Sequence, residues 1–99
     1  MLDWLKHDKV SEAYAVALTV EIVMEVGDKN ETFRIDALEH ELNGRTRYKT
    51  RVSILKQAKV ETEGNSNVRG EVWVAYSAPW TDEDSPEQAI VHQIALMTR

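Results

Sequence analysis

The stretch FRIDALEHELNGRTRYKTRVSI, residues 33–54, determines the fold that we expect for this chain. At its centre is Asn43-Gly44, a pair that favours a two-residue hairpin turn because both residues tolerate positive φ. If Leu42 faces Arg45 across this turn, the register of every other facing pair is fixed. The sequence therefore predicts antiparallel strands at 33–42 and 45–54.

This register separates the side chains by character. One face is largely apolar and contains the pairs Phe33–Ile54, Ile35–Val52 and Ala37–Thr50. The other face carries an opposite-charge pair, Asp36 with Arg51, as cross-strand energetics prefer. The competing interpretation is a helical turn over Ala37–Leu42, which contains good helix formers. We prefer the hairpin.

Two further strands flank this hairpin. Residues 14–26 alternate with a period of two, which predicts a strand with one buried face, and 27–30 has the composition of a turn. Residues 61–67 are polar and predict a loop before a strand at 70–77, which Pro79 ends because proline cannot donate to a ladder. A short helical turn is expected at 2–8.

A helix near the C-terminus has a clear start signal. Ser85-Pro86-Glu87-Gln88 combines an N-cap serine, a proline at the first helical position and a capping-box glutamine. The stripe Ile90, Val91, Ile94 and Met97 predicts its buried face. We expect the helix to run from Pro86 nearly to Thr98, with Ile90 and Ile94 among its most buried residues.

Together these elements predict an α+β fold, a four-stranded antiparallel sheet of largely meander connectivity with the C-terminal helix packed on one face. A chain of 99 residues has the size of one domain, and we expect 1–99 to be a single one. The chain has no cysteine, no apolar run near the roughly 20 residues that span a bilayer, and no signal-peptide pattern at its start. We therefore expect a cytoplasmic protein without a membrane partner.

The charge distribution is divided, although the net charge of −5 argues against general affinity for nucleic acid. Residues 45–60 contain no acidic residue and half of the chain's 12 basic ones. Four of these alternate along the strand and should share the face away from the helix: Arg45, Arg47, Lys49 and Arg51. The simpler interpretation is a solvated face, and the functional one is a docking surface for an acidic partner or nucleic acid.

Apolar residues are expected beside these charges. A pairing of the last two strands that places Leu55 opposite Trp73 puts both on the same outer face. Tryptophan and arginine are enriched at binding hot spots, so Trp73 is a candidate contact. It could equally be covered by the N-terminal segment around Trp4 and Leu5.

The sequence offers no catalytic, cofactor or metal site. His40 lies between Glu39 and Glu41, but neighbouring strand residues point to opposite faces and do not converge on a metal. The acidic run at 82–84 lacks the spacing of a calcium loop and better fits the start of a helix. The four glycines are isolated and form no phosphate loop.

Three functions remain in order of preference. The first is a non-catalytic protein-interaction or regulatory module that binds a protein partner or forms a homodimer, with Arg45, Arg47, Lys49, Arg51, Leu55 and Trp73 as binding residues. The second is an oligonucleotide-binding protein that uses the basic strand 45–59. The third is a small enzyme whose site is assembled from distant residues.

Overall fold

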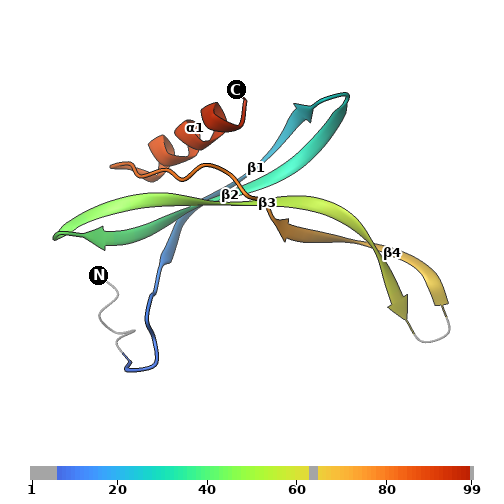
Figure 1. The fold of residues 1–99 in the computed structure, drawn as a ribbon, viewed down its shortest axis with the longest axis horizontal. Helices are drawn as coiled ribbons and strands as arrows, with labels where there is room; N and C mark the ends of the chain where they lie inside the picture. Colours follow the sequence, from blue (N-terminus) through green and yellow to red (C-terminus); the bar gives the residue numbers. More distant parts are fainter. Residues whose placement is uncertain (1–6, 63–64, 99) are drawn as a thin grey trace.

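The computed structural model describes residues 7–62 and 65–98, and this part of the chain forms an antiparallel sheet and one helix (Figure 1). The strands are β1 (Ala15–Val26), β2 (Lys29–Leu42), β3 (Arg45–Thr62) and β4 (Asn65–Ala75), and they lie in the order β1-β2-β3-β4. Helix α1 (Pro86–Met97) packs on one face of the sheet. The predicted α+β meander is confirmed. We call the face beneath α1 the inner face and the opposite one the outer face.

The register around Asn43-Gly44 is confirmed pair by pair. Phe33 lies opposite Ile54 and Ile35 opposite Val52. Asn43 and Gly44 have φ values of 52° and 76°, the left-handed conformations that a tight hairpin turn requires. The alternative of a helical turn over 37–42 is wrong, because these residues continue β2.

The inner core is built by alternate residues of the first three strands. Its most buried members are Phe33, Ile35, Ala37, Val52, Ile54 and, from the helix, Ile90. From β1, Leu18, Val20, Ile22 and Met24 pack against this cluster. The alternation predicted for 14–26 holds from Leu18 onward, but a register shift between Val16 and Leu18 interrupts it and leaves Val16 exposed.

Helix α1 begins where its cap predicts. The Ser85 hydroxyl accepts a hydrogen bond from the Gln88 amide at 3.2 Å, and Pro86 is the first helical residue. The predicted buried stripe needs correction, because the fully buried residues are Ala89, Ile90 and Gln93. Ile94 is only half-buried, and Val91 points to solvent because a single sheet covers a narrower arc of the helix than the stripe assumed.

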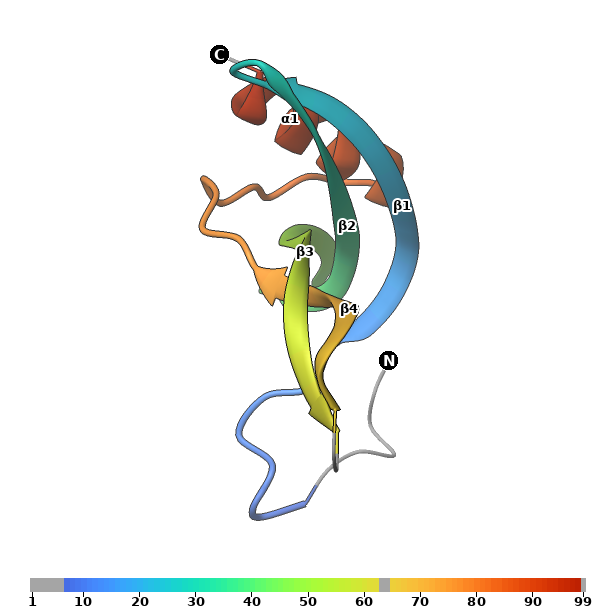
Figure 2. The same cartoon turned by 90° about the vertical axis from the view of Figure 1, so that its right-hand side faces the viewer.

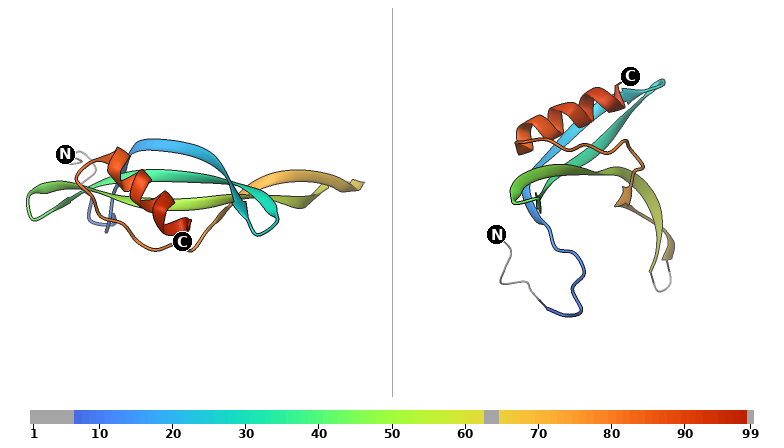
Figure 3. Two further views of the ribbon diagram at one scale, coloured as in Figure 1. Left: turned by 90° about the horizontal axis from the view of Figure 1, so that it is seen from above. Right: turned by 60° about the vertical axis from the view of Figure 1, so that its left-hand side comes forward.

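The far half of the β3–β4 hairpin projects beyond the helix. We call residues 55–75 the arm (Figure 3). Within the described residues α1 contacts β1, β2 and β3 but not β4. The radius of gyration is 16.9 Å and the longest dimension is 52 Å, whereas a compact chain of this length has a radius near 13 Å. In Figure 2 the arm extends away from the layer formed by α1, β1 and β2.

The expected loop at 61–67 is also wrong, since β3 continues to Thr62 and β4 already begins at Asn65. A hairpin with no helix over it needs no buried face, so a polar sequence can pair there as a strand. The strand predicted at 70–77 ends at Ala75. The helical turn predicted at 2–8 lies largely outside the described residues, as do Trp4 and Leu5.

Candidate interaction surface

Four basic residues in the first part of β3, Arg45, Arg47, Lys49 and Arg51, lie on the outer face, as their spacing predicts. Thr50 and Val52 alternate with them and face the helix, where Thr50 bonds to Gln93 and Val52 joins the core. The register places Arg47 beside His40 of β2 and Arg51 beside Asp36. The basic strand is therefore an outer-face feature, and its electrostatic effect depends on which acidic groups reach that face.

The largest acidic contribution comes from the connection between β4 and α1, residues 76–85, which we call the return segment. Glu83 forms two main-chain hydrogen bonds with Tyr48, of 2.9 and 3.0 Å, and thereby adds a short bridge to the free edge of β3. This bridge brings Asp82 and Asp84 onto the outer face beside Arg47. The sequence pattern assigned these carboxylates to the start of the helix and missed this contact.

Arg47 is tightly held by the return segment. Its Nε lies 3.0 Å from Asp82 Oδ1, its Nη2 donates to the Asp82 carbonyl at 3.1 Å, and its Nη1 pairs with Asp84. The hydrogen bond to Asp82 raises the pKa of the Arg47 guanidinium. Arg45 lies 3.6 Å from the same Asp84 carboxylate but is largely exposed. Arg47 therefore acts as a clamp on the return segment.

The other two cations are also partnered. Arg51 makes two hydrogen bonds to Asp36 Oδ2, of 2.9 and 3.1 Å, and Asp36 is buried and accepts a third bond from Thr19 at 2.7 Å. The Lys49 ammonium lies 3.9 Å from the centre of the Tyr14 ring. The positive potential expected from the sequence is thus offset within the chain itself.

Leu55 and Trp73 face each other on the outer face of the arm, in the predicted register, and both are half-buried. The Arg34 guanidinium lies 4.1 Å from the centre of the Trp73 ring, and Arg34 also pairs with Glu21 at 3.0 Å. Trp73 is therefore partly covered by a cation from β2 within the described structure. Part of the Trp73 side chain is still exposed.

An apolar surface that the sequence did not reveal lies on the inner face of the arm. Val72, Val74 and Tyr76 share the parity that faces the helix, as predicted, but they are 41%, 44% and 39% exposed. The cause is the position of α1, which ends its contacts at β3. Val74 lies opposite the core residue Ile54, and Tyr76 packs edge-to-face on Phe33 with 5.1 Å between ring centres. The alternation of residues along a strand shows which side chains share a face. It does not show how far a helix extends over that face.

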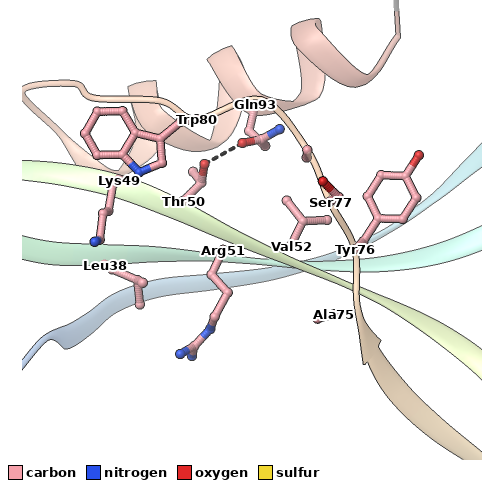
Figure 4. A pocket seen from close by; sticks show the side chains of 11 residues that line it. Leu38, Lys49, Thr50, Arg51, Val52, Ala75, Tyr76, Ser77, Trp80 and Gln93 are labelled. Carbon is pink, nitrogen blue, oxygen red and sulfur yellow. Dashed lines mark hydrogen bonds between the residues drawn. The ribbon is translucent and has the colours of Figure 1, made fainter.

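A polar network closes the inner face between β3 and α1. The Thr50 hydroxyl donates to Gln93 Oε1 (Figure 4). It is also hydrogen-bonded to the Thr81 hydroxyl. Gln93 Nε2 is buried and has no hydrogen-bond partner among the described residues. An open cavity of about 330 Å³ lies beside this network, where the return segment separates from β3, and Trp80 is on its rim. Because Nε2 is closed off from solvent, it cannot reach a ligand in this cavity.

Two histidines of the described part of the chain lie near carboxylates of the return segment. His40 Nε2 lies 3.9 Å from Asp82 Oδ1, and His92 Nδ1 lies 2.8 Å from Glu83 on the other side of the return segment. No group of three or more histidine or acidic side chains is placed to hold a metal ion there. Tyr48 donates to Glu39 at 3.3 Å, and burial, followed by the nearby Glu39 charge, raises the pKa of its hydroxyl.

The membrane and comparison findings add no site. Within residues 7–62 and 65–98, no helix combines the length and the apolar composition that crossing a bilayer requires. Comparison of the chain with known protein families, with curated proteins and with solved structures found no match in any of the three.

Proposed function

We propose that this chain is a non-catalytic protein-interaction module that binds its partner through the arm. The observation that carries the proposal is the uncovered inner face of β4, where Val72, Val74 and Tyr76 stand in a row without a helix over them. Rows of exposed apolar residues bounded by polar ones are typical of protein-binding surfaces. Leu55 and Trp73 extend the candidate surface around the outer side of the same arm.

The shape of the chain supports the same proposal. A small domain depends on burying apolar surface, yet this one holds a two-stranded arm away from its core. An isolated two-stranded hairpin is only marginally stable in water. A partner that packs on the arm would supply the burial that the chain's own helix does not.

Oligonucleotide binding through the basic strand 45–59 is the second candidate and has weaker support. Arg47, Lys49 and Arg51 each have a partner within the chain, and the acidic return segment lies beside them. A phosphate backbone would have to compete with these carboxylates. Arg45 and Lys56 keep exposed side chains, but each lies near a carboxylate, and strand alternation places them on opposite faces of the sheet. The positive area on the outer face is therefore smaller than the sequence suggested.

Native mass spectrometry of the protein isolated from its own host at its natural level tests the proposal. We expect a mass above the 11.3 kDa of the single chain. Val74→Lys should return the mass to that of the monomer, because a lysine at the centre of the apolar row cannot be buried without a partner charge. Val91→Lys is the matched control, since Val91 is also an exposed valine but lies on the solvent side of α1. A wild-type protein that is always monomeric would overturn the proposal.

A further inference from the structure

Among the described residues, no strand pairs with the main-chain groups on the outer edge of β4. In an antiparallel ladder the N–H and C=O groups of alternate residues point to opposite neighbours. The Tyr76 amide donates to the Val52 carbonyl at 2.9 Å, so the even-numbered residues of β4 face β3. The N–H and C=O groups of Glu71, Trp73 and Ala75 therefore point outward from the sheet, where β4 is the last strand. Such an edge is a template for pairing with another strand.

The exposed area is larger than one dimer interface needs. A folded monomer of 11.3 kDa exposes about 5,700 Å² by the usual scaling with mass. This chain exposes 7244 Å², an excess of about 1,500 Å² over that scaling. A standard interface takes about 800 Å² from each partner. The elongated chain can therefore give up that area to a second copy and still expose as much surface as a compact monomer.

The edge of β4 is complementary to itself in one register. If two copies of β4 run antiparallel with Val74 facing its own counterpart, each Val72 faces the Tyr76 of the other copy. Every exposed apolar residue of the inner face then meets another one. On the outer face Trp73 faces Ala75 and Glu71 faces Ser77. No like charges oppose each other, whereas a register centred on Glu71 would place two glutamates together.

The other free edge of the sheet is protected. The side chains that β1 presents on the outer face include Glu21 and Glu25. Charged side chains on an edge strand discourage pairing with another strand. The inner face of β1 is also partly covered, because α1 packs over it and Leu18, Val20, Ile22 and Met24 are half-buried there. The two edges of the sheet are therefore not equivalent, and β4 is the one suited to association.

We propose that the partner is a second copy of this chain, joined edge to edge through β4 with a two-fold axis at Val74, so that the two sheets become continuous. This proposal rests on the interaction function proposed above and names the partner. The two apolar rows then lie side by side across the axis and contact each other laterally within one continuous inner face.

Cysteine cross-linking tests the register. The wild-type chain has no cysteine, so a single introduced thiol reports on one position only. In the proposed pairing the two Val74 Cα atoms form a non-hydrogen-bonded pair about 4.5 Å apart, within disulfide range. Val74→Cys should form a covalent dimer rapidly on mild oxidation. Val72→Cys is a matched control on the same face, because its counterpart lies about 14 Å away along the strands. Cross-linking at Val72 in place of Val74 would overturn the register.

Sedimentation of the purified protein tests the association itself. Wild type should sediment with twice the chain mass over a wide range of concentration. Ala75→Pro should sediment as a monomer, because it removes an outward-pointing N–H and leaves the bonds between β3 and β4 intact. Its far-ultraviolet circular dichroism should match wild type, which shows that the variant folds.

The two proposals can fail separately. If purified wild type is monomeric but the protein from its host is held by a different chain, the homodimer is wrong and the interaction function stands. If the protein is monomeric in both experiments, both proposals are wrong.

Discussion

Replacing Gln93 with methionine should stabilise the protein. Gln93 is 1% exposed and lies between α1 and β3, where its Oε1 accepts a hydrogen bond from Thr50 while its Nε2 has no partner among the described residues. A buried donor without a partner destabilises the folded state by about 1–3 kcal/mol. Methionine has a similar length, can fill the same space and carries no hydrogen-bond donor.

The expected gain is the difference between two terms. The substitution removes the unpaired donor but also the bond from Thr50, which contributes about 0.5–1.5 kcal/mol. The Thr50 hydroxyl keeps its other partner, the Thr81 hydroxyl at 2.8 Å, and is not left unpaired. The net effect is a stabilisation of about 1 kcal/mol, which raises the melting temperature of a domain of this size by about 4–8 °C.

Thermal and urea unfolding followed by circular dichroism measure this change. Thr50→Val is the opposite case, because it removes the bond to Gln93 from the other side, leaves the Gln93 amide without that partner, and also removes the bond to the buried Thr81 hydroxyl. It should lower the free energy of unfolding by about 1–3 kcal/mol. A lower melting temperature for Gln93→Met would refute the reasoning, since it would mean that the amide nitrogen is hydrogen-bonded in solution.

Three further outcomes are expected. Ser85→Ala should lower the free energy of unfolding by about 1 kcal/mol in urea denaturation, because it removes the helix N-cap. Wild type should lose stability as the pH rises above the unfolded tyrosine pKa of about 10, because the pKa of Tyr48 is raised in the folded protein and the unfolded chain releases this proton first. The free energy of unfolding of Tyr48→Phe should fall less steeply across pH 9–11. If the basic strand binds DNA, Arg45→Gln should weaken binding and reduce the log–log salt slope by about 0.9 in a fluorescence titration, and no binding at low salt would eliminate that function.

The hairpin at Asn43-Gly44 was predictable because its information is local. A turn that needs two positive φ values fixes the facing pairs, and the alternation of Phe33 and Ile35 with charged residues fixes the faces. The start of α1 was predictable for the same reason, since Ser85 and Pro86 satisfy the first turn by themselves. Both depend on residues within a few positions of each other.

The other features of the fold and the site depend on contacts between residues far apart in the sequence, which a local sequence pattern does not show. Nothing in the spacing of Asp82 and Asp84 shows that the return segment turns back to Arg47, because that contact arises from the Tyr48–Glu83 bridge. The extent of α1 relative to the sheet is a similar case. Twelve helical residues cover three strands and leave the fourth open, whereas the sequence gives only the parity of β4.

The length of β3 has a consequence for the local unfolding of the protein. Its first part, up to Ile54, lies under α1, and its second part belongs to the arm. One strand thus crosses two regions whose local unfolding should differ in free energy. In hydrogen exchange, the amides of Val52 and Ile54 should persist longest, while those of the arm should exchange through openings that leave the core intact. Slower exchange confined to the arm would then report the arrival of its partner.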